Sequence, residues 1–135
     1  MANDVMDFGI RLTGGQLMRL AAQHFVQNLY VAALGHPADK EGLTYWTDHI
    51  IKENGSASEV ARSFLTGSEF MSQDLDDEDF VETLYMVYYN RIGTYDEVNT
   101  WESALAAGTP REDLITAFAS SSEWANECLA YGINV

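Results

Sequence analysis

Residues 25–46 read FVQNLYVAALGHPADKEGLTYW, and residues 80–101 read FVETLYMVYYNRIGTYDEVNTW. The two stretches align without a gap and share an aromatic and aliphatic framework, Phe25/Phe80, Val26/Val81, Leu29/Leu84, Tyr30/Tyr85 and Trp46/Trp101. Each is followed by a glycine and then by a closing motif, FLTGSEF at 64–70 or FASSSEW at 118–124. The chain therefore contains one unit twice, with a period of about 55 residues. We assign unit one to 15–75 and unit two to 76–131 of a single domain, 1–135.

The apolar residues of each unit recur at every third or fourth position, which is the spacing of a helix face. In unit one this stripe comprises Leu17, Leu20, Ala21, Phe25, Leu29 and Ala33. No segment alternates apolar and polar residues as a half-buried strand does. The pattern predicts helices at about 15–34, 40–53, 57–65, 67–73, 77–90, 96–107, 110–119 and 121–131. We expect an all-α fold, with two similar multi-helix repeat units packed into one compact domain about a pseudo-twofold axis.

Signals for helix ends support these boundaries. A capping box pairs a Ser or Thr with a Glu three residues later, and it occurs at Ser56/Glu59, Thr66/Glu69, Thr109/Glu112 and Ser120/Glu123. Asp39 is expected to cap the second helix, and Pro110 to take a first helical position. Gly35, Gly55 and Gly108 stand where the preceding helices need a left-handed residue to stop.

The charge balance excludes several classes of partner. The chain carries 21 acidic and 7 basic residues, a net charge of −14, but 47% of its residues are hydrophobic, which is enough for a folded core. Nucleic acids are bound by clusters of Lys and Arg. The sequence contains no such cluster, so we predict no nucleic-acid partner. Most of the acids fall at predicted helix starts, where they complement the helix dipole.

The N-terminal stretch does not resemble a secretory signal, since Asp4 and Asp7 stand where apolar or basic residues are needed. No segment approaches the length of about eighteen apolar residues that crosses a membrane, so we predict no membrane insertion. The single Cys128 cannot form an internal disulfide. Cys128 has apolar neighbours in the sequence, so we predict that its small side chain is buried.

Acidic residues between the units raise the question of calcium. Asp74, Asp76 and Glu78 alternate as in a calcium loop, but Asp79 and Tyr85 stand where an EF-hand needs Gly and Glu. The EF-hand interpretation therefore fails. A looser calcium site at the three acids is the alternative to a simple role at the start of the next helix. We expect no cofactor.

Other ligand and catalytic patterns are absent. His24, His36 and His49 lack the i, i+4 spacing of a helical zinc site. The sequence has no nucleophile elbow, phosphate-binding loop or dinucleotide fingerprint. We predict that the protein is not an enzyme.

Aromatic residues crowd unit two and offer a binding surface. Their spacing allows a ring of Tyr88 or Tyr95 to face away from the core stripe. Exposed aromatic rings beside carboxylates are typical of protein-binding or glycan-binding surfaces. The alternative is that these rings pack in the core. His36 is a third candidate partner-binding residue, at an outward turn position.

The run from Phe25 to Trp46, with the closing Ser68-Glu69-Phe70, resembles the bacterial family called domain of unknown function 4214. A more distant similarity is to the helical domains of phycobilisome linker proteins. The sequence departs from the family pattern at His36, where Arg is usual, and at 90–94, where Gly, Pro and Asp would stand. The resemblance implies large exported bacterial proteins and no assigned activity.

These observations lead to a non-enzymatic interaction or structural module that mediates protein-protein or glycan binding, including adhesion, in an extracellular, surface-layer or virion assembly. Self-association is included among the expected protein contacts. The expected location is outside the cell or at its surface, without a cleaved N-terminal signal. The alternatives are a cytoplasmic scaffold or linker protein, and a calcium-dependent binder or small enzyme.

Overall fold

The computed structural model describes residues 12–135, and within this range it contains helices and no strands. The helices are α1 (Gly14–Leu34), α2 (Lys40–Lys52), α3 (Ala57–Leu65), α4 (Ser68–Met71), α5 (Asp77–Leu84), α6 (Tyr95–Ala106), α7 (Arg111–Ala119) and α8 (Ser122–Tyr131). A π-helical turn, η2 (Tyr85–Tyr89), continues α5. The predicted all-α fold is confirmed. The stretch with Asp4 and Asp7 lies outside the described residues.

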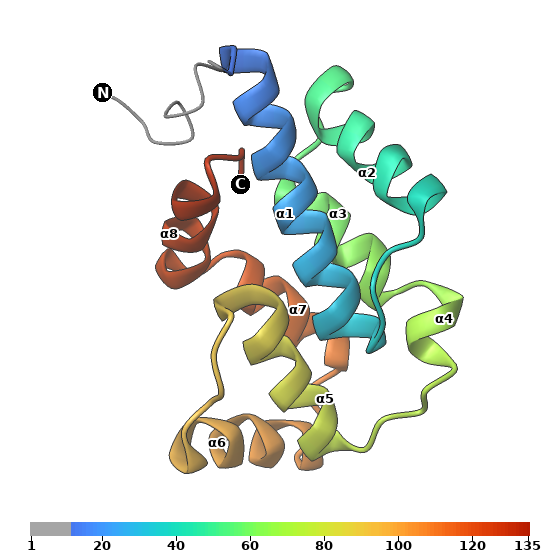
Figure 1. The fold of residues 1–135 in the computed structure, drawn as a ribbon. Coiled ribbons are helices and arrows are strands. Elements are labelled where there is room, and N and C mark those ends of the chain that lie inside the picture. Colours follow the sequence, from blue (N-terminus) through green and yellow to red (C-terminus); the bar gives the residue numbers. More distant parts are fainter. Residues whose placement is uncertain (1–11) are drawn as a thin grey trace.

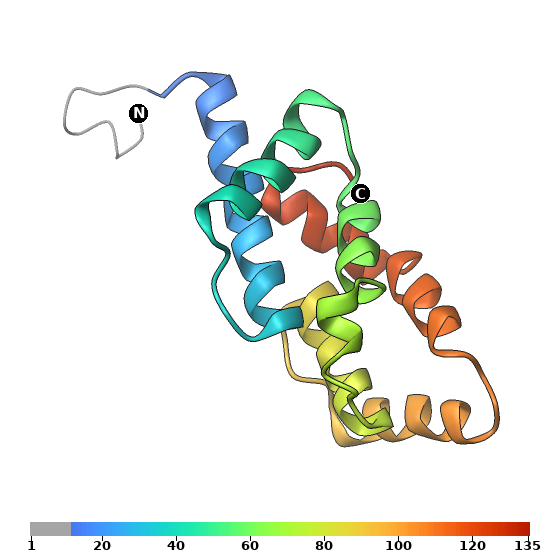
Figure 2. The ribbon, with the colours of Figure 1, turned by 90° about the vertical axis from the view of Figure 1, so that its right-hand side faces the viewer.

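Helix α1 is the longest element and organises the others. Figure 1 shows it across the front of the molecule, with α2 on one side and α8 on the other. Its inner side packs on α3 and on the α5–η2 segment. Helix α6 lies at the end of the molecule farthest from the start of α1, and the chain after α8 runs back to the beginning of α3 (Figure 2). No helix of the described part is long and apolar enough to cross a membrane.

The two units build the same aromatic cluster. In unit one the Phe64 ring lies 4.8 Å from Tyr30 and 5.2 Å from Trp46, centroid to centroid. In unit two the counterpart Phe118 lies 4.9 Å from Tyr85 and 5.4 Å from Trp101. The interplanar angles also agree, at 83° and 85° for the tyrosine pairs. The sequence repeat is therefore a structural repeat.

Each unit is closed by an aromatic residue that packs on the opposite unit. Phe70 ends unit one and lies 6.4 Å from Phe80 of unit two. Trp124 ends unit two and lies 6.1 Å from Phe25 of unit one. This exchange makes the two units share one hydrophobic core.

Two of the predicted N-caps are confirmed. Asp39 Oδ1 accepts the Gly42 N–H at 2.6 Å, and Ser56 Oγ accepts the Glu59 N–H at 3.0 Å. Complete capping boxes occur at two other places, Thr13 with Gln16 and Thr94 with Glu97. In the box at Thr13, Gln16 takes the position that Glu occupies in each of the predicted boxes.

At Ser56 the cap bond is present without the reciprocal bond of the predicted box. The other three predicted capping boxes are wrong. Helices α4, α7 and α8 are capped at Gly67, Pro110 and Ser121, one residue later than predicted. The hydroxyls of Thr66 and Ser120 instead donate to backbone carbonyls four residues earlier. Pro110 precedes the helix with ψ 146°, so it is the cap and not the first helical residue.

Gly35 and Gly108 adopt the expected left-handed conformation, with φ of 76° and 109°. The prediction for Gly55 is wrong, because Asn54 takes that conformation at φ 57°. Gly55 has a different reason to be glycine. A Cβ there would stand 2.5 Å from the His49 ring.

The helix predicted over 77–90 changes pitch at Tyr85, where η2 begins. The wider π turn carries two large rings on the core side, Tyr88 against Trp124 at 4.9 Å and Tyr89 stacked on Phe118 at 5.0 Å. Unit one has Ala33 and Leu34 at the counterpart positions and continues as a regular α-helix. The larger side chains of unit two thus coincide with the local widening.

Candidate interaction surfaces

The outer face of α1 consists of Leu17, Leu20, His24 and Val31. These residues recur at intervals of three, four and seven, so they line one side of the helix. The three aliphatic side chains are each about half exposed, and His24 is exposed. The sequence stripe assigned Leu17 and Leu20 to the core side, and that assignment is wrong. An apolar stripe that no described element covers is typical of an interface.

The charge pattern around this face is unusual for the chain. Helix α1 contains no acidic residue, although the chain has 21. Its one formal charge, Arg19, is bonded to Asp48 of α2. The neighbours of the stripe, including Gln16, Gln23 and Asn28, are neutral. The outer face of α1 is therefore an apolar surface free of carboxylates.

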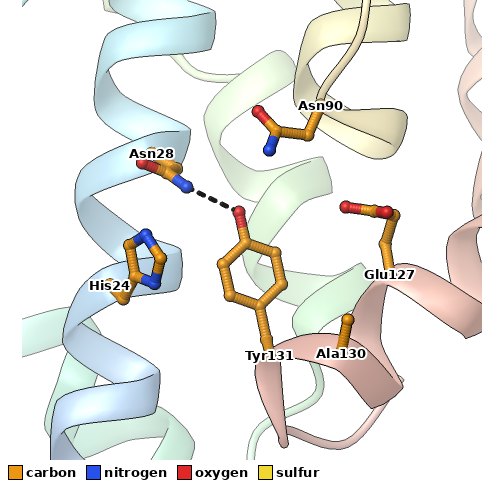
Figure 3. A pocket seen from close by; sticks show the side chains of 6 residues that line it. All are labelled: His24, Asn28, Asn90, Glu127, Ala130 and Tyr131. Carbon is orange, nitrogen blue, oxygen red and sulfur yellow. Dashed lines mark hydrogen bonds between the residues drawn. The ribbon is translucent and has the colours of Figure 1, made fainter.

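A polar hollow lies beside this face. It has a volume of about 240 Å³ and is lined by His24, Asn28, Asn90, Glu127, Ala130 and Tyr131. Figure 3 shows that α1 supplies the first two, the end of η2 supplies Asn90, and α8 supplies the others. We call it the Tyr131 hollow. Its amides, carboxylate and imidazole offer both hydrogen-bond donors and acceptors to a docked group.

Tyr131 is held firmly in this hollow. Asn28 Nδ2 donates to its hydroxyl at 2.8 Å, and its ring meets Phe25 and His24 edge-on at 5.4 and 5.5 Å. Burial raises the pKa of the Tyr131 hydroxyl, so it stays protonated at neutral pH. The residues that line the hollow include no activated nucleophile.

His36 is exposed, as the sequence predicted, and it links two parts of unit one. Its Nε2 lies 2.6 Å from Glu69 Oε2, and its Nδ1 lies 2.8 Å from the Pro37 carbonyl. The hydrogen bond to Glu69 raises the pKa of His36. His49 is bonded to Glu53 and Glu59 at 3.1 Å, and these bonds raise its pKa as well.

Arg91 is the counterpart of His36 in unit two and makes a larger network. It pairs with Glu97 at 2.9 Å and with Glu123 at 2.8 Å. Its guanidinium also lies over the rings of Tyr85 and Tyr89, at 5.2 and 5.6 Å from their centroids. The Arg91 hydrogen bonds lower the pKa of Glu97 to about 2. Both turn residues therefore tie the inter-helix turn to the closing motif, and the partner-binding role of His36 stays a prediction.

Tyr88 is not a surface residue. It is 1% exposed and packs on Trp124 and Phe118, so the prediction of a partner-binding Tyr88 is wrong. The counterpart in unit one, Ala33, is also buried, so the repeat places this position in the core. Tyr95 is 82% exposed, as expected for a binding residue, and its binding role stays a prediction. It borders a shallow hollow with Glu78, Glu82 and Glu102.

The inter-unit acids are placed by helix α5. Asp76 caps this helix by accepting the Asp79 N–H at 2.8 Å, and Glu78 lies in its first turn. Asp74 sits in the preceding loop at φ 50°. Within 12–135 no three His, Cys, Asp or Glu side chains converge on a metal-sized position. Cys128 is buried as predicted, and burial raises its thiol pKa to about 12.

The outer face of α1 and the Tyr131 hollow were missed from sequence. The signal for the face was present, since residues 17, 20, 24 and 31 follow a second helical stripe beside the core stripe. The hollow had no sequence signal, because it joins residues of α1, η2 and α8 that lie far apart along the chain.

The fold defines an all-α domain made of two helical repeat units that close one another. The sequence matches the family described as a domain of unknown function (DUF4214) over residues 16–73 and 61–128, and the chain belongs to this family. The two matched regions are consistent with the two repeat units. No curated protein and no solved structure matches the chain.

Proposed function

We propose that this protein is a non-enzymatic interaction module that assembles with a second copy of itself through the outer face of α1. The observation that carries the proposal is the exposed aliphatic stripe of Leu17, Leu20 and Val31 on a helix with no acidic residue. Removing such side chains from water stabilises an interface by about 25 cal/mol per Å² of apolar area.

The stripe suits a twofold contact with itself. Leu17 and Val31 lie seven residues on either side of His24. If two copies of α1 cross antiparallel with His24 at the axis, Leu17 of one copy lies beside Val31 of the other. An isologous interface needs this self-complementary arrangement. The polar His24 and the adjacent Tyr131 hollow then help to fix the register.

Electrostatics favours a second copy at this face over other faces. Two chains of charge −14 repel one another wherever carboxylates meet. The side chains of α1 that would meet carry no carboxylate, and Glu127 is the one acidic residue that lines the adjacent Tyr131 hollow. Added salt screens the remaining long-range repulsion, so self-association should strengthen as the salt concentration rises.

Sedimentation equilibrium of the full chain tests the proposal. We expect a concentration-dependent dimer that is strengthened by sodium chloride, and a monomer for the double variant Leu20→Glu, Val31→Glu. Ile92→Glu is the control, because Ile92 is 79% exposed and far from α1 in the sequence. A monomeric wild type at millimolar concentration, or a dimer that persists in the double variant, would overturn the proposal.

We further propose that the module works without a cofactor in a protein assembly outside the cell, at a surface layer or in a virion. The basis for this setting is the resemblance of the Phe25–Trp46 run to domains of exported proteins. Detection of the chain, by antibody, in the culture medium or on intact cells tests it. Retention of all the protein inside cells would favour the intracellular scaffold instead.

A further inference from the structure

A narrow apolar cavity opens between α4, α5 and α7. It has a volume of about 170 Å³, and its lining is Leu65, Thr66, Phe70, Met71, Phe80, Arg111, Glu112 and Ile115. The Phe80 ring lies 6.4 Å from the Phe70 ring and 4.6 Å from the Arg111 guanidinium carbon. We call this cavity the Phe80 slot.

The repeat shows what fills the same place in the other half of the molecule. The counterpart of Phe70 there is Trp124, which is larger and fully buried. Its indole Nε1 donates to Ser58 Oγ at 2.7 Å, and Ser58 is the counterpart of Glu112. The chain then continues, and the Asn134 carbonyl accepts the Ala57 N–H at 2.9 Å. Both the bulky ring and a backbone carbonyl are thus supplied by the chain itself.

At the Phe80 slot the corresponding ring is the smaller Phe70, and no backbone carbonyl is supplied within 12–135. Helix α4 ends at Met71, whereas its counterpart α8 continues to Tyr131. The counterpart of Ala57 is Arg111, the first residue of α7, and α7 has no side-chain cap. Within 12–135 the Arg111 N–H has no backbone acceptor. The slot therefore has a smaller closing ring than its counterpart, and it lacks the carbonyl that its counterpart possesses.

The surface around the slot is acidic. The first turn of α7 carries Glu112 and Asp113, and the first turn of α5 carries a further three acids, Asp77, Glu78 and Asp79. The Arg111 guanidinium is already bonded to Asp77 and to the Leu75 carbonyl, both at 2.8 Å. The charge complementary to this rim is positive.

We propose that the Phe80 slot binds a basic segment of a partner protein that inserts one aromatic or leucine-sized side chain. The inserted side chain lies beside Phe70, in the cavity that the Phe70 ring borders. A backbone carbonyl of the segment accepts the Arg111 N–H, as Asn134 does for Ala57. Lysine or arginine residues on either side of the inserted residue face Glu112 and Asp113.

The size of the slot agrees with this occupant. A buried apolar cavity of about 150 Å³ is large enough to bind benzene, and the slot is slightly larger at about 170 Å³. A single ring fits, and a folded domain does not. Deep insertion of one side chain, with a charged rim, is the usual form of a peptide-recognition hot spot.

Heteronuclear NMR titration of the full chain provides the test, with three probes. Indole probes the slot alone. A capped peptide with one phenylalanine among lysines probes the whole site, and the same peptide with alanine in place of phenylalanine probes the rim charge. We expect indole and the phenylalanine peptide to shift the amides of Phe70, Phe80, Arg111 and Ile115. The alanine peptide should bind at least about tenfold more weakly.

The chain offers its own blocking variant. Phe70→Trp copies the other half and should weaken binding of the phenylalanine peptide at least about tenfold. Met71→Lys adds a positive charge at the exposed mouth and should weaken it without disturbing the core. Leu129→Lys is the control, since Leu129 is exposed on α8 and distant from the slot in sequence. A retained melting temperature establishes that each variant is folded.

Several results would overturn the proposal. These are equal affinity of the two peptides, unchanged binding to Phe70→Trp and Met71→Lys, or amide shifts that avoid the slot. The test is independent of self-association through α1. The variant Leu20→Glu, Val31→Glu should bind the phenylalanine peptide as the wild type does, whether or not the wild type forms a dimer.

Discussion

The two halves of the molecule contain the same aromatic cluster, but different residues fill the space beside it. In unit two, Tyr89 stacks on Phe118 and donates to Ser121 Oγ at 2.8 Å. In unit one, Leu34 and Gly67 occupy the counterpart positions and border a hollow of about 220 Å³ beside Tyr30 and Trp46. The comparison recurs at the closing residues, where Trp124 fills its site and Phe70 leaves the Phe80 slot open.

The lesson is that a repeated framework need not give repeated surfaces. The framework residues set the helices and their crossing, while a few non-identical positions decide which cavities are filled. Unit one, with the smaller residue at each of these positions, borders both apolar openings. Substitutions that exchange residues between the halves can therefore test the comparison directly.

The largest expected effect comes from removing the closing residues. Trp124→Ala should destabilise the fold by about 3–5 kcal/mol, because a fully buried ring is lost from contact with Phe25 and Tyr88. Phe70→Ala should cost about 1 kcal/mol less, since Phe70 already borders a cavity. Urea unfolding of both variants measures the difference. Equal losses would mean that the two closures are energetically equivalent.

A reciprocal exchange addresses the cluster itself. Tyr89→Leu should destabilise by about 1–2 kcal/mol, because it removes the stacked ring and the hydrogen bond to Ser121. Leu34→Tyr should be neutral or stabilising by up to about 1 kcal/mol, because the new ring enters the existing hollow. Chemical denaturation of both variants provides the readout. If Leu34→Tyr were the more damaging change, the hollow would not be the counterpart of the Tyr89 site.

The third prediction concerns pH and compares His36 with Arg91. The raised pKa of His36 means that its contribution to stability is complete below its unfolded pKa of about 6.5 and is lost as pH rises through the folded pKa. Arg91 stays charged throughout this range. His36→Arg should therefore reduce the fall in melting temperature between about pH 6 and pH 8.5, by no more than about 3 °C.

The pH dependence that remains in His36→Arg should come from His49, whose pKa is also raised. Glu69→Gln is the matched control, since it removes the partner of His36 and keeps the imidazole. It should flatten the same part of the profile. An unchanged wild-type profile in both variants would show that the His36–Glu69 pair does not contribute to stability.

The smallest effect is expected at Tyr88. Its hydroxyl is buried without a hydrogen-bond partner among the described residues, and burial raises its pKa. Tyr88→Phe should therefore be neutral or stabilising by up to about 1 kcal/mol. Tyr89→Phe, which loses the bond to Ser121, should destabilise by about 1 kcal/mol. Thermal unfolding of the pair compares them, and a destabilised Tyr88→Phe would reveal an unseen partner for the hydroxyl.

Much of the fold could be predicted because it depends on local rules. Helix α1 was expected at 15–34 and is found at Gly14–Leu34, since apolar spacing and the stop at Gly35 are properties of neighbouring residues. The caps at Thr66 and Ser120 were misplaced by one residue, because an adjacent residue with suitable geometry was available in each case. Cap selection depends on backbone direction as well as on residue type.

The candidate sites could be predicted far less well. Tyr88 was expected outside, but residues 80, 84 and 88 recur at intervals of four and share one helix face. The counterpart Ala33 is likewise buried. Leu17 and Leu20 were assigned to the core, although the core stripe begins only at Ala22. The Phe80 slot depends on the volume difference between Phe70 and Trp124, which becomes meaningful only when the two halves are superposed in space.

The exchange of Phe70 and Trp124 between units gives each half the geometry of a subunit in a twofold dimer. In a dimer of identical units, any substitution in a closing residue would appear twice, and it would open or fill the cavity at both closing sites together. Joining the units in one chain removes that constraint. One closing residue can then keep the molecule folded, while the site of the other is free to bind a group from another molecule.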